Sequence, residues 1–81
     1  MELYQLKTFI TVAGTQNVTR AAEMLHTTPP SVSNHIRQIE EELGIRLFTR
    51  TPKGMFITSQ GEQLLNQAEQ VLEAAGQLKT L

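Results

Sequence analysis

Two adjacent prolines fix where the best-patterned helix of this chain begins. In the stretch TTPPSVSNHIRQIEEELG, residues 27–44, Pro29 and Pro30 stand directly before a helical pattern. Proline is tolerated in the first turn of a helix, because the backbone N–H groups there have no intrahelical acceptor. If Thr28 is the N-cap, its hydroxyl can accept a hydrogen bond only from the N–H of Ser31, since Pro30 offers none. The prolines therefore predict a helix that begins at Pro29.

This helix has a single apolar stripe, which decides which of its sides is exposed. Apolar residues recur at helical spacing: Val32, Ile36, Ile39 and Leu43. The opposite face carries Pro30, Ser31, Asn34, Arg37, Gln38 and Glu41, with Ser33 and His35 on its flanks. Gly44 suits the left-handed position after a helix, with Ile45 folding back on Ile39. Because no acid precedes Glu40 in this helix, its outer face is predicted to be polar and locally free of negative charge.

Two shorter helices are predicted before the prolines. The first has its apolar residues three and four apart and stops near Gly14: Leu3, Leu6, Phe9, Ile10 and Ala13. The second has Asn17 as N-cap and ends near His26. Four of its side chains are expected to face the core: Val18, Ala21, Ala22 and Leu25. After Gly44, two short apolar runs flank Thr51-Pro52-Lys53-Gly54, which suits a type I turn, so a small hairpin is expected.

A long helix is predicted to close the chain. Ser59 and Glu62 are spaced as a capping box, so this helix begins at Thr58 or Ser59 and runs toward Leu81. Its apolar stripe comprises Leu64, Leu65, Ala68, Val71, Leu72, Ala75 and Leu78. At about 1.5 Å per residue the helix is roughly 34 Å long, so only its first turns can lie over the first helix and the hairpin. The rest of the stripe predicts a symmetric homodimer through this helix, with those seven residues at the interface.

Helix, turn, helix and a hairpin with a basic tip form the layout of a winged helix-turn-helix. The fold class is therefore mainly α, with three helices and a short β-hairpin wing in residues 1–58, followed by a linker and dimerisation helix in residues 59–81. In this layout the second helix of the pair enters the DNA major groove with its N-terminal residues against base edges. That position requires short hydrogen-bonding side chains, which Ser31, Ser33 and Asn34 provide. Arg37, one turn along, can reach a phosphate or a guanine edge.

The charges of the chain are unevenly placed. The net charge is −1, yet no acid lies between Thr27 and Gln38, and the only charges from Leu43 to Gly61 belong to three cations. These are Arg46, Arg50 and Lys53. A local positive face is therefore compatible with a slightly acidic protein.

The stretch LKTFITVAGTQNVTRAAEMLHTTPPSVSNHIRQIEEELGIRLFTRTPKGMFITSQG resembles the DNA-binding domain of LysR-type transcriptional regulators. The combined markers are TRAA..LH, P.VS..I..IE..LG..LF.R and T..G, and with the following helix the resemblance covers essentially the whole chain. It implies a bacterial regulator in which a helix-turn-helix at residues 18–37 binds double-stranded DNA, the wing lies near the minor groove, and the last helix dimerises. Thr28, Pro30, Ser33 and Arg37 match positions at the DNA face, and Arg50 matches the arginine that meets the backbone.

Together these arguments predict one set of DNA-binding residues: Thr28, Pro30, Ser31, Ser33, Asn34, Arg37, Gln38, Arg50 and Lys53. The chain departs from the family at two positions, with Pro29 where glutamine is common and Asn34 where arginine is common. The DNA sequences that family members prefer are therefore not expected to apply to this chain. Full-length members carry an effector domain after the linker helix and can form higher oligomers; no small-molecule ligand is predicted for residues 1–81.

Other classes of function fit less well. An enzyme would have to use His26 and His35, which lack the i, i+4 spacing of a helical metal pair and have no nucleophile and base beside them. No metal or cofactor is expected, and the chain has no cysteine, no apolar run of membrane-spanning length and no signal peptide, so a cytoplasmic, nucleoid-associated protein is expected. A protein-docking winged helix stays open as the alternative, although a docking surface has no reason to keep residues 27–38 free of acid.

Overall fold

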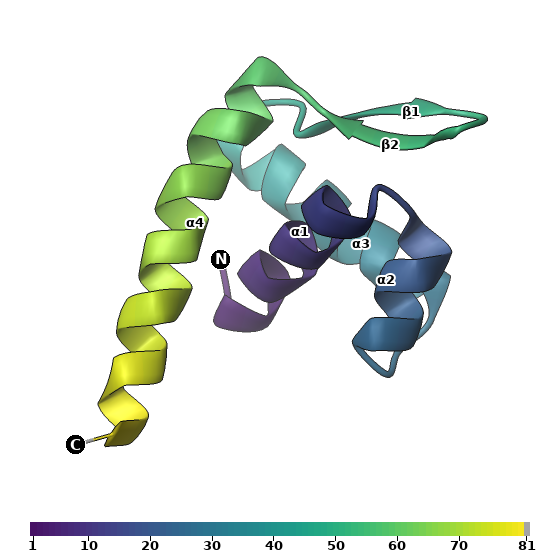
Figure 1. The fold of residues 1–81 in the computed structure, drawn as a ribbon. Helices are drawn as coiled ribbons and strands as arrows, with labels where there is room; N and C mark the ends of the chain where they lie inside the picture. Colours follow the sequence, from purple (N-terminus) through teal and green to yellow (C-terminus); the bar gives the residue numbers. More distant parts are fainter. Residues whose placement is uncertain (81) are drawn as a thin grey trace.

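The computed structural model describes residues 1–80, in which four α-helices pack below a two-stranded hairpin (Figure 1). In chain order the elements are α1 (Leu3–Thr15), α2 (Val18–Met24), α3 (Pro29–Leu43), β1 (Phe48–Thr51), β2 (Gly54–Ile57), α4 (Ser59–Gln77) and the 3-10 helix η1 (Leu78–Thr80). This order confirms the predicted winged helix-turn-helix, with α2 and α3 as the helix pair and the hairpin as the wing. The predicted end of the last helix at Leu81 lies outside the described residues.

Both ends of α3 follow the sequence pattern. Pro29 and Pro30 occupy its first two positions, and the Thr28 hydroxyl accepts from the backbone N–H of Ser31 at 3.3 Å. At the other end Gly44 is left-handed with φ 68°, and the N–H of the next residue donates to the Glu40 carbonyl at 3.3 Å, as in a Schellman motif. The helix is therefore fixed at both ends by local chemistry.

The core fills the space between the first three helices, the wing and the first half of α4. Its centre is Phe9, whose ring packs edge-on against Phe48 with the ring centroids 5.6 Å apart. Of the predicted α3 stripe, Val32, Ile36 and Ile39 are buried, whereas Leu43 is 40% exposed. Leu43 is exposed because the last turn of α3 lies beside the N-terminus rather than the body of α1. There the Met1 amine pairs with the Glu42 carboxylate at 3.0 Å.

The end of α1 lies one residue after Gly14, in agreement with the predicted stop near that glycine, and the wing bonds to the chain there. The helix continues to Thr15, and Gln16 then adopts a left-handed φ of 57° while its N–H donates to the Val12 carbonyl at 2.7 Å. The Met55 N–H of β2 donates to the Gln16 carbonyl at 3.1 Å. A Cβ at Gly54 would lie 2.5 Å from that carbonyl oxygen, so the close approach of wing and helix depends on the glycine of the wing.

The wing is a two-stranded antiparallel hairpin with the register Phe48↔Ile57 to Thr51↔Gly54, so its tip is formed by residues 52 and 53 as expected. The helix that follows is not capped by Ser59 and Glu62. Its N-cap is Thr58, whose hydroxyl accepts from the Gly61 N–H at 3.0 Å and reaches the Arg46 carbonyl at 2.6 Å. The cap therefore joins the start of α4 to the segment that leads into the wing.

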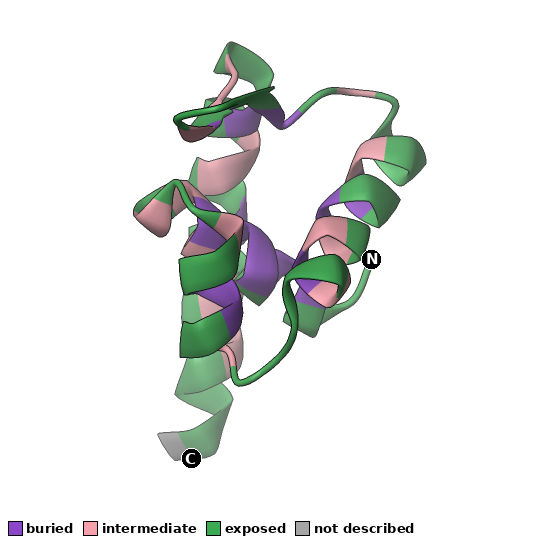
Figure 2. Cartoon of the chain, turned by 90° about the vertical axis from the view of Figure 1, so that its right-hand side faces the viewer, coloured by how far each residue is buried: buried purple, intermediate pink, exposed green. Residues whose placement is uncertain are grey.

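The first half of α4 covers the core, and its second half extends away from the other helices (Figure 1). Ala68 is only 2% exposed and belongs to the chain's own core, so the prediction that it lies at a dimer interface is wrong for this fold. Three other residues of the predicted stripe are half-buried against the same core: Leu64, Leu65 and Leu72. Further along, the helix is mostly exposed (Figure 2), with Val71 at 45% and Leu78 at 69% exposure.

Candidate nucleic-acid interface

The outer face of α3 is exposed along its length. Pro30, Asn34, Arg37, Gln38 and Glu41 are all solvent-accessible, as the stripe on the opposite side predicted. The Asn34 side chain has no hydrogen-bond partner within residues 1–80, so both its amide donor and its carbonyl acceptor are available to a ligand. The first half of this face is the part of the helix that carries no acid.

Two hydroxyl residues at the start of α3 are engaged with each other. The Thr28 hydroxyl donates to Ser31 Oγ at 3.0 Å while accepting from the Ser31 N–H. Thr28 is exposed and Ser31 is half-buried, so the pair forms a capping unit that still leaves one face of each oxygen open to solvent. Their first role in the structure is therefore to begin the helix.

One side of this face, the α1 flank, is held by polar side chains that bond to α1. Gln5 Nε2 donates to Gln38 Oε1 at 2.8 Å, and Thr8 Oγ1 lies 2.9 Å from His35 Nδ1. The Thr8 hydroxyl also donates to the Tyr4 carbonyl at 3.0 Å, and the Tyr4 ring meets the His35 ring edge-on with centroids 5.0 Å apart. Gln38 therefore keeps both amide N–H groups and one lone pair of its carbonyl oxygen for DNA, and His35 serves packing between helices.

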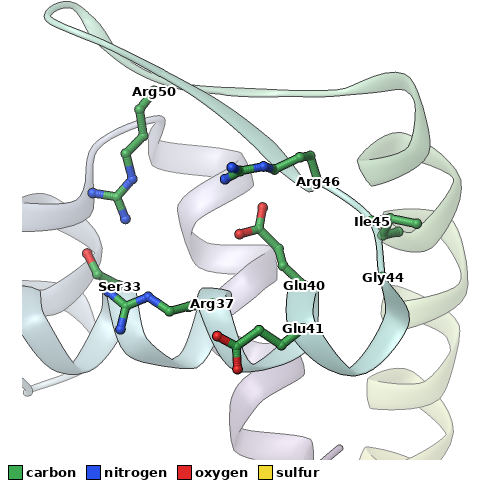
Figure 3. A pocket seen from close by; sticks show the side chains of 8 residues that line it. All are labelled: Ser33, Arg37, Glu40, Glu41, Gly44, Ile45, Arg46 and Arg50. Carbon is green, nitrogen blue, oxygen red and sulfur yellow. The ribbon is translucent and has the colours of Figure 1, made fainter.

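The other side, the wing flank, contains a cleft of about 560 Å³ between α3 and the wing. Three arginines line it: Arg37 from α3, Arg46 from the segment before β1, and Arg50 from β1. Figure 3 shows the Arg50 side chain extending toward Ser33 and Arg37 across this cleft. All three arginines are exposed, and Ser33 is half-buried at the same wall. The structure thus brings together Ser33, Arg37 and Arg50, which lie up to seventeen positions apart in the chain.

Glu40 closes the inner end of the cleft. Its Oε2 accepts from the Leu47 N–H at 2.8 Å, and the side chain is half-buried. Its partner is therefore a backbone group of the segment before β1. Sequence reasoning left Arg46 out of the DNA-binding set, although it stands in the acid-free segment 43–61 that carries the wing cations. The absence of acids from residues 43–61 is the feature of the sequence that points to Arg46.

Lys53 lies apart from the three-arginine cleft. It lines a shallower hollow of about 250 Å³ between the wing and the start of α2, together with Arg50, Asn17 and Thr19. Arg50 borders both hollows, so the wing presents cations on two sides of the strand. The nine residues predicted to bind DNA therefore lie on α3, on its N-cap and on the wing, and they do not share one pocket.

Residues 1–80 contain no group of three potential metal ligands, and His26 lies exposed in the turn after α2 with a left-handed φ of 56°. No helix among these residues is long and apolar enough to cross a bilayer.

Residues 3–62 match the family model described as bacterial regulatory helix-turn-helix protein, lysR family. The chain is 44% identical over 77 residues to the HTH-type transcriptional regulator YofA of Bacillus subtilis, and 43% identical over 79 residues to the Hca operon transcriptional activator HcaR of Escherichia coli. These alignments cover 95% and 98% of the chain but 27% of each relative. The chain thus spans about a quarter of the length of the curated relatives it matches.

Two solved structures with DNA are also similar. The CbnR_DBD–DNA complex matches with a TM-score of 0.95 at 36% identity, covering 99% of this chain and 92% of that one. The BenM_DBD/catB site 1 DNA complex matches with a TM-score of 0.93 at 34% identity, covering 99% and 86% respectively. Both matches therefore include the helices and the wing described above.

Proposed function

Since the chain belongs to the lysR family of bacterial regulatory helix-turn-helix proteins, we propose that it binds duplex DNA as part of a transcription regulator. Relatives named as a transcriptional regulator and a transcriptional activator support this role, as do the two similar domains solved with DNA. Such a protein acts in the bacterial cytoplasm, where the chromosome lies. The effector domain and its ligand belong to the part of such regulators beyond this chain's length.

In the proposed complex α3 lies in the major groove and the wing lies over the adjacent backbone and minor groove. One observation carries the proposal: the exposed N-terminal half of α3 has no acid and stands beside a cleft with three arginines. Phosphates attract those arginines, while the short side chains of Ser33 and Asn34 let the helix approach base edges. Residues 1–58 form the DNA-binding unit and residues 59–81 the dimerising helix.

Titration of a fluorescent duplex with the protein at rising salt tests the binding itself. We expect the affinity to fall steeply with salt, because the cations that release counterions are local and the chain as a whole carries −1. An affinity that does not change with salt, or an absence of binding at low salt, favours the alternative of a protein-docking winged helix.

Asn34 is proposed to read a base. An exposed asparagine with a free amide and carbonyl can pair with the N6 and N7 atoms of adenine, a contact worth about 1–3 kcal/mol of discrimination. Selection of random duplexes by the parent and by Asn34→Ala compares their preferred sequences. The same preferred sequence for both proteins shows that Asn34 does not read a base.

The second half of α4 is proposed to hold a homodimer together. Val71 and Leu78 are exposed apolar residues on a helix whose first half is already used by the core, and Ala75 between them is half-buried and small. A mate helix packed there would place two α3 helices on one side of a DNA duplex. Leu64, Leu65 and Leu72 would border this contact, being only half-buried within one chain.

Sedimentation of the parent and of a Val71→Asp, Leu78→Asp variant at matched concentrations tests the dimer. We expect a concentration-dependent dimer for the parent and a monomer for the variant, since a buried carboxylate would oppose association. A parent that stays monomeric at high micromolar concentration contradicts the dimer, and a variant that dimerises equally well contradicts this interface.

A further inference from the structure

The three arginines of the wing flank are unpaired although two carboxylates line the same cleft. Within residues 1–80 none of the guanidinium groups of Arg37, Arg46 and Arg50 has a hydrogen-bond or ion-pair partner. Glu40 and Glu41 also line the cleft, yet Glu40 bonds to a backbone N–H instead. An arrangement that served only to stabilise the fold would pair these charges, whereas three free guanidinium groups around one cleft suit an anionic ligand.

Glu40 holds the backbone next to one of those arginines, Arg46. Its bond to the Leu47 N–H ties the last turn of α3 to the chain between Arg46 and β1. The Arg46 carbonyl is held from the other side by the Thr58 hydroxyl. The backbone that carries Arg46 is therefore fixed against α3 and α4, and Figure 3 shows its side chain extending over the Glu40 carboxylate.

From this geometry we propose that the α3–wing cleft binds the phosphodiester backbone of one DNA strand, with Arg46 as a third phosphate ligand beside Arg37 and Arg50. Glu40 acts as the positioning residue that sets Arg46 and the wing against α3. The proposal rests on the proposed DNA binding and adds to it one ligand residue and one positioning residue.

The chemistry favours phosphate over a base edge in this cleft. Planar guanidinium groups donate two parallel hydrogen bonds to phosphate oxygens, and three of them on different elements can follow a strand whose charges repeat along its length. Glu40 and Glu41 would repel a phosphate that entered without the arginines, so the cleft depends on Arg46 to offset them.

Arg46→Ala tests the ligand role, with Lys79→Ala as the matched control, since Lys79 is an exposed cation on η1 at the far end of α4. Each variant loses one positive charge. For Arg46→Ala we expect the slope of log affinity against log salt to become shallower by about 0.9, with an affinity about eightfold lower at about 0.1 M salt. We expect Lys79→Ala to match the parent within about twofold.

Glu40 is tested by two variants that lose the same negative charge. Glu40→Gln keeps an oxygen that can accept from the Leu47 N–H, whereas Glu40→Ala removes it. We expect Glu40→Gln to bind DNA at least as tightly as the parent and to keep the Leu47 amide protected from hydrogen exchange. We expect Glu40→Ala to lose that protection and to bind about fivefold more weakly than Glu40→Gln, at a temperature where both are folded.

The outcomes separate this inference from the proposed function. A parent that does not bind DNA overturns the proposed function. A parent that binds with a normal salt slope, while Arg46→Ala behaves like Lys79→Ala, overturns the phosphate role of Arg46 and leaves DNA binding standing. Equal gains in affinity for Glu40→Gln and Glu40→Ala overturn the positioning role, because charge alone would then explain both.

Discussion

The two flanks of α3 are both polar, but only one of them has its polar groups satisfied. On the α1 flank Gln38 and His35 bond to Gln5 and Thr8 on the neighbouring helix. On the wing flank the guanidinium groups of the three arginines have no partner within residues 1–80. The α1 flank therefore holds the helix in place, and the wing flank is available to a ligand.

This difference separates two effects that a substitution in α3 can have. A change on the α1 flank removes contacts of the folded state, so it is expected to lower the free energy of unfolding. A change to the three wing-flank arginines removes charges that have no partner within residues 1–80, so it is expected to alter DNA binding with little effect on stability. Variants on the two flanks are therefore expected to separate a loss of stability from a loss of DNA affinity.

The largest effect is expected from removing all the wing-flank charges together. For the variant Arg37→Ala, Arg46→Ala, Arg50→Ala, we predict a salt slope shallower by about two to three and an affinity lower by about two to three orders of magnitude at about 0.1 M salt. The thermal midpoint should stay near that of the parent, because the three side chains are exposed and unpaired. The control is Lys7→Ala, Lys79→Ala, which loses two cations elsewhere; an equal loss per charge in this control would show that location is irrelevant.

A smaller effect is expected from Thr8→Val on the α1 flank, which should lower the stability of the fold and leave the salt slope of DNA binding unchanged. Thr8 is 3% exposed, and its hydroxyl bonds both the Tyr4 carbonyl and His35 Nδ1. Its loss leaves the His35 nitrogen without this partner, which costs about 1–3 kcal/mol, and each 1 kcal/mol lowers the midpoint by about 4–8 °C in a domain of this size. Thermal unfolding and the salt slope are measured on the same variant; an unchanged midpoint with a changed slope would reverse the roles of the flanks.

The smallest effect is expected at the end of the α1 flank, where the Met1 amine pairs with Glu42 at 3.0 Å. The Glu42 side chain is 50% exposed, so water screens this ion pair. We predict that Glu42→Gln changes the free energy of unfolding by less than about 0.5 kcal/mol. Denaturant unfolding checks this, and a loss above about 1 kcal/mol would mean that the exposed end of the flank is as important as Thr8.

The parts of the fold that the sequence predicted are those fixed by neighbours in the chain. Thr28, the two prolines and Gly44 determine both ends of α3 through their own backbone chemistry, and the stripe of Val32, Ile36 and Ile39 needs only helical spacing. The hairpin tip followed in the same way from the turn residues between two apolar runs.

The parts that differed depend on segments distant in the chain. The carbonyl of Gln16, just after α1, accepts from the Met55 N–H of the wing some forty residues later, a contact that no local pattern indicates. Glu40 faces a backbone N–H because the segment before β1 folds back over α3, which also brings Arg46 to the cleft. Ala68 is buried by the other helices, which no pattern within α4 reveals.

The residues proposed to bind DNA were predicted by residue type but not by geometry. The acid-free face and the family markers singled out Arg37 and Arg50, yet spacing along the chain does not show that both line one cleft. Spacing also does not show that Gln38 Oε1 accepts a hydrogen bond from Gln5. Polarity is visible in the sequence, whereas the satisfaction of a polar group by a distant partner is visible only in the fold.

The claim that the wing flank faces the ligand is tested most directly by an NMR titration of the labelled protein with a DNA duplex. We predict that the side-chain Nε–H signals of Arg37, Arg46 and Arg50 shift on binding, while the backbone amide signals of Tyr4 and Thr8 on the α1 flank stay in place. Arginine signals that do not move, together with shifts at Tyr4 and Thr8, would contradict it.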